Sequence, residues 1–289
     1  MNYHLPVLLQ EVINQLSIKT NNIYVDATLG HGGHTLEILK NGGIVYGFDQ
    51  DPKNIEIAIN RINKSELNHN FFPINSNFNQ LQKKVNQKVD GLLADLGLSQ
   101  NQQTDQDRGF SFNDSLSLDM RLDPTTQILT AEEIINTYSF DQLYQIFTKL
   151  GQELYSKPLI LRIIKERQKS PIKTGQKLAD IVRKFYLERH IHTKIDPSTK
   201  IFLSLRITVN EENINLQKLL KQSLNIVKTG GTVCIITFHS GEDRIVKQFI
   251  KDQSSKNKII ANKSIKPSFS EIKQNPLSRS AILRSYKIV

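Results

Sequence analysis

The sequence predicts an α/β protein with a mostly parallel sheet and an inserted helical segment. Short apolar runs alternate with helical stretches up to residue 97, the alternation stops between residues 105 and 197, and apolar runs return near the C-terminus. Repeated strand, helix and strand favours parallel strands joined by right-handed crossovers. A length of 289 residues is enough for two domains of ordinary size.

Four strands are expected in the first part of the chain, each an apolar run bounded by turn residues. They cover residues 23–27, 44–48, 71–74 and 89–94. A glycine turn at residues 30–33 precedes the first helix of this region. The next helix is predicted by apolar residues at helical spacing, which are Ile55, Ala58, Ile59 and Ile62.

The inserted segment is predicted to be helical. Its clearest amphipathic face has apolar residues at i, i+3, i+4 and i+7, namely Leu178, Ile181, Val182 and Phe185. A long helical stretch is then expected over residues 198–227, followed by a strand at 232–238, a helix at 242–250 and two strands at 258–263 and 281–288. We therefore expect an α/β domain over residues 1–104 and 198–289, with a helical cap domain over residues 105–197.

The composition excludes several classes of protein. The single cysteine, Cys234, cannot form a disulfide within the chain or a thiolate metal site, and its apolar surroundings indicate a buried structural thiol. The mean hydropathy is −0.37, and no apolar run approaches the roughly 18 residues of a membrane span. The N-terminus also lacks the pattern of a secretory signal, so we expect a cytoplasmic protein that is not associated with a membrane.

The chain is basic, with 38 Lys and Arg against 28 Asp and Glu and a net charge of +10. This balance indicates a polyanionic partner. Residues 165–200 contain ten basic and four acidic side chains, so +6 of the excess lies in the second half of the cap. The cluster favours a phosphate-binding surface, although a solvated helix face would have the same composition.

The glycine turn and the end of the second strand together predict a nucleoside site. Small residues allow the backbone of the turn to approach a ligand, and the helix that follows favours an anion at its N-terminus. Asp49 ends the second strand nineteen residues after Gly30, where a carboxylate can accept both hydroxyls of a ribose. The turn departs from the dinucleotide fingerprint, so a ligand with a carboxylate and a ribose but no phosphate, such as S-adenosylmethionine, suits it better.

Two further residues are expected near the same crevice. Asp95 ends the fourth strand and points above the carboxyl ends of the strands, where a functional role or a loop-capping role is open to it. Phe78 follows the third strand and could pack on an adenine ring or belong to the core. His31 and His34 share the glycine turn without a suitably spaced third ligand, so no metal site is predicted.

Several motifs, in chain order, resemble the bacterial RsmH (MraW) family. They are HLPVLLQE at 4–11, GGH at 32–34, RGFSF at 108–112 with LDMR at 118–121, FHS at 238–240 with EDR at 242–244, and NP at 275–276 with SRSA at 278–281. The resemblance covers essentially the whole chain. It implies the class I fold of S-adenosylmethionine-dependent methyltransferases and methylation of the exocyclic N4 of a cytidine in the decoding region of 16S rRNA.

The resemblance also implies which residues bind the cofactor. By position these are Gly32, Gly33, His34, Asp49, Phe78, Asp95 and Gln102. The sequence departs from the family pattern at Gln100 and Asn101, where the family favours a Ser-Pro pair before Gln102, and at Gly241, which replaces a usual leucine. The first departure bears on Gln102, and the second could loosen the start of the helix that follows. The residues before the last strands look shortened, which could trim an RNA-facing surface.

The expected chemistry depends mainly on alignment, because the N4 amine of cytosine is a weak nucleophile. Alignment can supply about 7 to 11 kcal/mol in well-oriented reactions. We expect Asp95 to be the catalytic residue, accepting an N4 hydrogen bond alone or with the backbone carbonyls of Leu96 and Gly97. His239 lies at a strand end, where a substrate contact and a structural role are equally compatible with the sequence.

Substrate contacts are also expected at the start of the cap, at Arg108, Phe110, Phe112 and Arg121. Their rings could stack on bases while their guanidinium groups bind phosphate. The alternative is that the two rings belong to the core of the cap and that Arg121 pairs with Asp119 or Asp123.

The expected partner is 16S rRNA, within the small ribosomal subunit, with an unpaired or extruded target base. A methyltransferase of DNA or protein and a non-catalytic RNA-binding or ribosome-assembly factor are the alternatives. The Pro-Pro tetrapeptide of DNA amino-methylases is absent after the fourth strand. Binding of S-adenosylmethionine would separate an enzyme from a binding factor.

Overall fold

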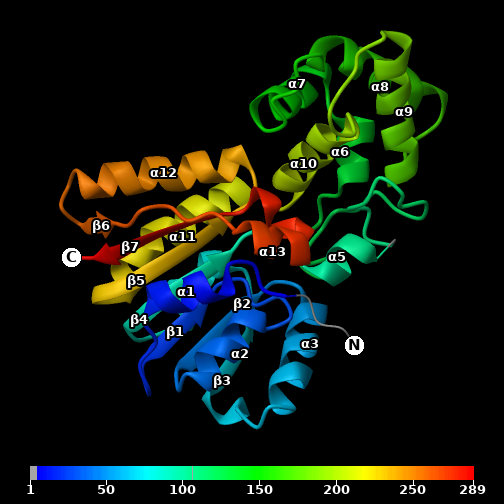
Figure 1. The fold of residues 1–289 in the computed structure, drawn as a ribbon. Coiled ribbons are helices and arrows are strands. Elements are labelled where there is room, and N and C mark those ends of the chain that lie inside the picture. Colours follow the sequence, from blue (N-terminus) through cyan, green and yellow to red (C-terminus); the bar gives the residue numbers. More distant parts are fainter. Residues whose placement is uncertain (1–4, 106) are drawn as a thin grey trace. The chain divides into compact units, whose positions relative to one another are not determined.

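A computed structural model describes residues 5–105 and 107–289, and the chain divides into two compact units (Figure 1). The sheet unit contains the chain up to Ser99 together with Asn213–Val289, and the helical unit is Gln100–Glu212. Each unit has its own hydrophobic core. The two units are described separately below.

The sheet unit contains a seven-stranded sheet in the order β3-β2-β1-β4-β5-β7-β6. Its strands are β1 (Ile23–Asp26), β2 (Ile44–Asp49), β3 (Phe71–Asn75), β4 (Val89–Asp95), β5 (Val227–Thr237), β6 (Ile259–Ala261) and β7 (Ile282–Ile288). Four pairs of neighbouring strands are parallel: β3 with β2, β2 with β1, β1 with β4, and β4 with β5. β7 is antiparallel to both β5 and β6. The α/β class and the mostly parallel sheet predicted from the sequence are confirmed.

Helices cover both faces of this sheet because successive residues of its strands point to opposite sides. Tyr24 contributes to the core under α1, α2 and α3, and its neighbour Val25 contributes to the core under α4, α11 and α12. The helices and 3₁₀ turns are α1 (Leu9–Leu16), α2 (Gly33–Lys40), α3 (Pro52–Asn63), η1 (Asn68–Asn70), η2 (Phe78–Gln80), α4 (Leu81–Lys84), α11 (Glu212–Ile226), α12 (Ser240–Ser254), α13 (Phe269–Gln274) and η3 (Pro276–Ser280). Cys234 is fully buried among these side chains, and burial raises the pKa of its thiol. This agrees with the structural thiol expected.

The strand order reverses between β1 and β4. From β1 the chain builds outward to β2 and β3, and it then returns to place β4 and β5 on the other side. A crevice at the carboxyl ends of the strands forms at such a point in open α/β sheets. The fold therefore places the ends of β1 and β4, and the loops that follow them, where a ligand is expected.

The helical unit is built from α5 (Gln100–Thr104), α6 (Ala131–Thr137), α7 (Phe140–Lys149), α8 (Ser156–Lys169), α9 (Gly175–Glu188) and α10 (Ser198–Val209). The face predicted on α9 is confirmed: Leu178, Val182 and Phe185 are fully buried, and Ile181 packs against the same core. This core joins side chains from α6 to α10. The unit is thus held together by helix packing.

The helical stretch expected over residues 198–227 is present, and it is divided into two helices. α10 ends at Val209, and α11 begins at Glu212 after Glu211, whose φ of 49° lies in the left-handed region that ends helices. Ile201, Leu205 and Val209 bury α10 in the helical core. The helical unit therefore includes residues 100–104 and 198–212, which were expected to belong to the α/β domain.

Within residues 5–105 and 107–289, no helix is both long enough and apolar enough to cross a membrane.

Candidate functional site

The loop between β1 and α2 approaches the crevice with little side-chain bulk. Gly30 and Gly32 have φ of 49° and 71°, a region that glycine enters without a steric penalty. A Cβ at Gly30 would meet no atom within 4 Å, so the turn borders open space there. A Cβ at Gly33 would lie 2.4 Å from Pro6 Cγ, so this glycine permits a close crossing of two chain segments.

The crossing segment is the N-terminal strap, which we define as Leu5–Leu8. The Val7 carbonyl lies 3.0 Å from His34 Nε2, and the Leu8 amide donates to Glu271 Oε1 on α13 at 2.7 Å. Asn275 adds a hydrogen bond to the Leu5 carbonyl at 3.2 Å. The strap thus joins the C-terminal region of the chain to the glycine turn. His4, the first residue of its motif, lies outside the described residues.

Asp49, at the end of β2, is fixed by three hydrogen bonds. Oδ2 accepts from the Gly30 amide at 2.9 Å and from Asn54 Nδ2 at 3.0 Å, and Oδ1 accepts from the Asp51 amide at 2.9 Å. Burial raises the pKa of Asp49 to about 6 in spite of these bonds. A carboxylate offers about four acceptor positions. One position on Oδ1 is left for a ligand hydroxyl. The sequence predicted that Asp49 would accept hydrogen bonds from both ribose hydroxyls.

Asp26, at the end of β1, is committed to the protein. Oδ2 accepts from Thr35 Oγ1 at 2.7 Å, and Oδ1 accepts from the Thr28 amide at 3.2 Å. The side chain is almost fully buried, and this burial raises its pKa to about 6. Asp26 therefore ties the start of α2 to β1.

Asp95, at the end of β4, is held differently. Its amide donates to Thr28 Oγ1 at 2.6 Å, which fixes the backbone, but its buried Oδ1 accepts no hydrogen bond from the residues that the structure describes. Burial raises the pKa of Asp95 well above its usual value, and the nearby Asp26 and Glu242 raise it further. Asp95 thus has a buried acceptor that is left without a donor, at the switch point of the sheet.

His34 is the neighbour of Asp95 on α2. Its Nδ1 lies 3.7 Å from Asp95 Oδ2. Burial lowers the pKa of His34 to about 4, so the ring is neutral at pH 7 and the contact is not an ion pair. Because a carbonyl only accepts, Nε2 carries the proton toward Val7, and the Nδ1 lone pair faces Asp95. The strap therefore fixes the tautomer of His34.

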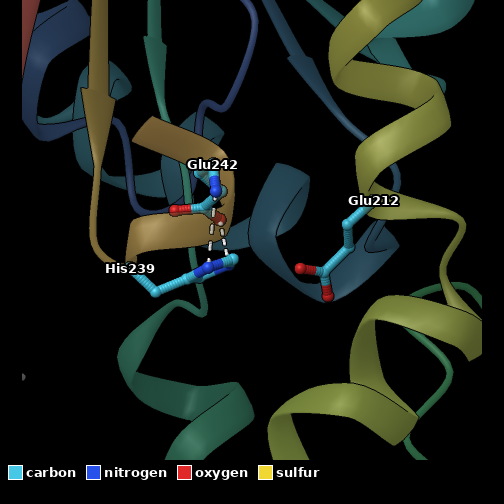
Figure 2. A group of neighbouring side chains, drawn as sticks. All are labelled: Glu212, His239 and Glu242. Carbon is cyan, nitrogen blue, oxygen red and sulfur yellow. Dashed lines mark hydrogen bonds and ion pairs between the residues drawn. The ribbon is translucent and has the colours of Figure 1, made fainter. Parts of the chain in front are cut away.

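His239 caps helix α12 (Figure 2). Its Nδ1 accepts from the Gly241 amide at 3.2 Å, and its Nε2 lies 3.1 Å from Glu242 Oε1, while Glu242 Oε2 accepts from the Phe238 amide at 2.9 Å. A Cβ at Gly241 would lie 3.0 Å from His239 Nδ1, so glycine leaves room for the cap. The structure thus gives His239 a structural role, and the departure at Gly241 does not loosen the helix start.

The other two cofactor candidates are placed as follows. Phe78 lies in η2, partly buried against the core of the sheet unit. Gln102 lies in α5 of the helical unit, where its side chain is buried. The structure thus gathers Gly32, Gly33, His34, Asp49 and Asp95 around the strand ends of one unit, and it places Gln102 in the other unit.

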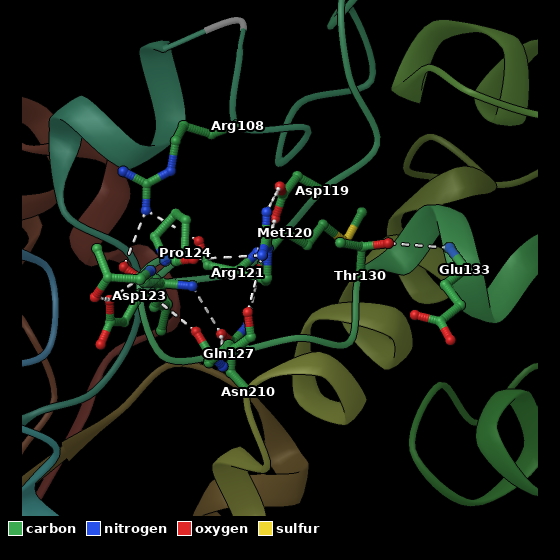
Figure 3. A network of polar contacts seen from close by, with 12 residues as sticks. Arg108, Asp119, Met120, Arg121, Asp123, Pro124, Gln127, Thr130, Glu133 and Asn210 are labelled. Carbon is green, nitrogen blue, oxygen red and sulfur yellow. Dashed lines mark hydrogen bonds and ion pairs between the residues drawn. The ribbon is translucent and has the colours of Figure 1, made fainter.

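The two arginines predicted to contact the substrate, Arg108 and Arg121, belong to a polar network of the helical unit (Figure 3). Arg121 donates to both oxygens of Asp119, at 2.8 and 2.7 Å, and to the Gln127 carbonyl at 2.8 Å. Arg108 Nη2 donates to the carbonyls of Arg121 and Leu122 at 3.0 and 3.1 Å. The pairing of Arg121 with Asp119, one of the two alternatives, is what the structure contains.

The two phenylalanines of this region pack inward. Phe110 and Phe112 lie against the helical core, and Phe112 makes an edge contact with Phe202 at 4.8 Å between ring centroids. Arg108 lies 5.8 Å from the Phe110 ring. These contacts favour the structural alternative for both rings.

The basic cluster at residues 165–200 is partly consumed by internal contacts. Arg167 donates to the carbonyls of Ile135 and Tyr138, Arg183 pairs with Asp196 at 2.7 Å, and Arg189 lies 4.0 Å from the Phe185 ring centroid. These arginines therefore stabilise the unit instead of presenting free charge.

Sequence reasoning missed Thr28, Glu271 and the strap contacts. Thr28 lies in the predicted glycine-turn segment, but nothing in its spacing indicates that it accepts from the Asp95 amide. Asn275 was part of a recognised motif without a role. Glu271 had no signal, because its partner Leu8 is 263 residues away along the chain.

Comparison with known proteins decides the family. The model of the MraW methylase family matches residues 1–289. The chain belongs to the MraW methylase family. Among the relatives of this MraW methylase, the ribosomal RNA small subunit methyltransferase H of Clostridioides difficile is 38% identical over 98% of this chain and 97% of its own length. The protein of the same name from Mycoplasma mycoides is 39% identical over 98% of both chains.

Solved structures agree with the fold of a MraW methylase. A Streptococcus mutans protein crystallised with SAH matches 99% of this chain and 100% of its own, with a TM-score of 0.51 and 12% identity. An rRNA methylase from Streptococcus thermophilus matches 99% of both chains, with a TM-score of 0.50 and 11% identity. At these identities the likeness shows the fold alone. The fold class and the family inferred from the sequence are confirmed, and the protein is a methyl-transferring enzyme.

Proposed function

We propose that this methylase transfers a methyl group from S-adenosylmethionine to the exocyclic N4 of a cytidine in the decoding region of 16S rRNA. We place the reaction in the cytoplasm, on rRNA within the small ribosomal subunit. The family match over residues 1–289 carries the proposal, because the named relatives are small-subunit rRNA methyltransferases over nearly their whole lengths.

The residues around the strand ends fit the cofactor. The glycine turn borders open space at Gly30, and the start of α2 suits the cofactor carboxylate. The remaining acceptor position on Asp49 Oδ1 suits a ribose hydroxyl, and Phe78 would pack on the adenine. The bound cofactor supplies an electrophilic methyl group on a positively charged sulfur. We assign Gly32, Gly33, His34, Asp49, Phe78 and Asp95 to this site. Gln102 is proposed as a cofactor residue on the family resemblance alone.

Asp95 is the catalytic residue in this proposal. Its carboxylate, which belongs to a side chain that is 22% exposed, would accept an N4 hydrogen bond and orient the nitrogen lone pair toward the methyl group. A cation next to a carboxylate favours the ionised form, which opposes the effect of burial on Asp95. Once nitrogen has gained the methyl group, it becomes acidic and its proton passes to Asp95. Alignment of this kind can contribute about 7 to 11 kcal/mol, so the amine needs no strong base before attack.

The residues predicted to contact the substrate have a structural role in this proposal. They are Arg108, Phe110, Phe112, Arg121 and His239. Their side chains are engaged in pairs, caps and core contacts within their own units. We retain them as residues that hold the substrate-facing loops in shape. The target cytidine must in any case be unpaired or extruded to expose N4.

The test is the site of methylation. Small subunits from cells that lack this protein are incubated with the purified protein and isotopically labelled S-adenosylmethionine, and the rRNA is digested to nucleosides for mass spectrometry. We expect label in N4-methylcytidine, with protein-free 16S rRNA as a second substrate to establish whether assembly is required. Label in 5-methylcytidine, or no transfer by protein that binds the cofactor in calorimetry, would refute the proposal.

A further inference from the structure

The C-terminal segment carries most of the net charge. Residues 256–289 contain eight Lys and Arg and one acidic residue, Glu271, so this segment supplies +7 of the chain's +10. The same excess in the second half of the predicted cap is +6 over a similar length. The C-terminal segment is therefore a second candidate for a phosphate-binding surface besides the cap.

The charges of the C-terminal segment are free, unlike the arginines of the helical unit. Arg284 pairs with Asp243 at 2.6 Å. The other seven basic side chains are exposed and make no side-chain hydrogen bond or ion pair with the residues that the structure describes. They are Lys256, Lys258, Lys263, Lys266, Lys273, Arg279 and Lys287.

One end of this segment lies at the carboxyl edge of the sheet. Ile282, the first residue of β7, pairs with Thr237, the last residue of β5, so α13 and η3 precede β7 at the edge where β1, β4 and β5 end (Figure 1). The strap leads from there to the glycine turn: α13 binds Leu8, and Val7 binds His34. α13 is therefore at the rim of the proposed cofactor site, within the same unit.

The rim patch, which we define as Lys266, Phe269, Lys273 and Arg279, combines three cations with an aromatic ring. Phe269 is 85% exposed, although burial of such an apolar ring is favourable. Phe269 and Lys273 are four residues apart on α13 and share a face, and η3 with Arg279 packs against α13. Proteins that bind single-stranded RNA pair exposed rings for base stacking with cations for phosphates in this way.

We propose that the rim patch binds single-stranded RNA next to the target cytidine, with Phe269 stacked on a base and the three cations on phosphates. This inference rests on the proposed function. Protection of a sheet edge by lysine accounts for Lys258 and Lys263, which flank β6 and lie beside β7. It does not account for Phe269, Lys273 and Arg279, which lie outside the edge strand.

The first test compares two triple variants that lose the same charge. K266Q/K273Q/R279Q removes the cations of the rim patch, and K83Q/K84Q/K256Q removes three exposed lysines near the start of β4 and the start of β6, at the opposite edge. Binding of a fluorescent single-stranded 12-nucleotide RNA is measured from 50 to 300 mM KCl. The slope of log affinity against log salt should fall by about 2 for the rim variant, because each single-strand phosphate contact contributes about 0.7. Equal slopes for the two variants would overturn the proposal.

The second test concerns the ring. Phe269→Ala should weaken RNA binding about tenfold without changing the salt slope, and Phe269→Tyr should restore it, because either ring can stack. The exposure of Phe269 predicts an unchanged unfolding midpoint in both variants. Wild-type affinity in Phe269→Ala would exclude stacking on this ring.

The two proposals fail separately. In the methylation assay, KM for small subunits should rise for the rim variant and stay constant for the opposite-edge variant. If wild-type protein modifies N4 and both triple variants have the wild-type KM and RNA affinity, the rim patch fails while the proposed function stands. If wild-type protein modifies no cytidine N4 but the rim variant alone loses RNA binding, the proposed function fails while the RNA-binding patch stands.

Discussion

The polar networks of the two units differ in whether their charged groups have hydrogen-bond partners. At the strand ends of the sheet unit, Asp26 and Asp95 repel each other, and Asp95 Oδ1 has no hydrogen-bond donor among the described residues. In the helical unit, Arg121 uses both oxygens of Asp119, and this hydrogen bonding raises the pKa of Arg121. A carboxyl group such as Asp95, which has an acceptor without a donor and a displaced pKa, is typical of a ligand-binding site. A network in which the charged groups are paired, such as that of Arg121, stabilises the fold.

The sequence and the structure differ in which residues they favour as ligand-binding residues. Arginines and phenylalanines at the start of an inserted segment suggest RNA contact, and a single aspartate at a strand end suggests less. In the structure both arginines donate hydrogen bonds to backbone carbonyls, whereas Asp95 Oδ1 has no donor among the described residues. A local motif shows which side chains are present, but only the fold shows which of them already have partners.

The largest expected effect is on catalysis at Asp95. Asp95→Asn keeps the shape and one acceptor oxygen but cannot take up the proton, so we expect the methylation rate at saturating substrates to fall about a hundredfold. The unfolding midpoint should hold or rise, because a neutral amide removes the repulsion from Asp26 and Glu242. A fall in the midpoint that accounts for the lost rate would instead place Asp95 in a structural network.

The network of Arg121 should respond in stability. Arg121→Met leaves Asp119 partly buried, with 23% of its side chain exposed, and leaves the Gln127 carbonyl without its guanidinium donor. We expect a loss of about 2 kcal/mol in the free energy of unfolding, measured in urea. Lys169→Met is the control, because Lys169 is 59% exposed in its pair with Glu166 and pairs of exposed side chains contribute little. Loss of RNA affinity in Arg121→Met with unchanged stability would restore Arg121 as a phosphate ligand.

A substitution at Asp49 tests whether the end of β2 also binds a ligand. Asp49→Asn has one acceptor oxygen in place of two, so it cannot serve the Gly30 and Asp51 amides together with a ribose hydroxyl. We expect S-adenosylmethionine to bind about tenfold more weakly in calorimetry, which corresponds to about 1.4 kcal/mol. Asp90→Asn, near the start of β4 and paired with Lys228, is the matched control and should bind normally. Equal affinities for the two variants would exclude Asp49 from the cofactor site.

The sequence predicted the parts of the fold that depend on local pattern. Apolar runs identified the strands of the parallel sheet, and their last residues identified Asp49 and Asp95, because strand ends in such a fold meet at one edge. The break at Glu211 was missed, because helical residues continue on both sides of it. The strap, its clamp on α13 and the rim patch depend on contacts between the two ends of the chain, which periodicity does not record.

The smallest expected effect is the pH dependence of stability that two buried groups of the sheet unit produce. Asp26 is buried with a pKa of about 6 against 3.8 in an unfolded chain, so its ionised form is penalised above pH 6. The folded protein binds the extra proton between pH 6 and 4, and Asp26 therefore adds stability as the pH falls through this window. His34, with a pKa lowered from 6.5 to about 4, removes stability over nearly the same range, because the unfolded chain takes up its proton first.

The opposing groups can be separated by one substitution. Asp26→Asn eliminates the favourable response and leaves that of His34, so its free energy of unfolding should fall relative to wild type by about 1 kcal/mol between pH 6 and 5. Urea unfolding at pH 7, 6 and 5 measures the difference, and Asp119→Asn serves as the comparison from the helical unit. Parallel pH profiles for Asp26→Asn and wild type would mean that the strand-end aspartates are solvated, and the contrast between the two networks would then rest on Asp95 alone.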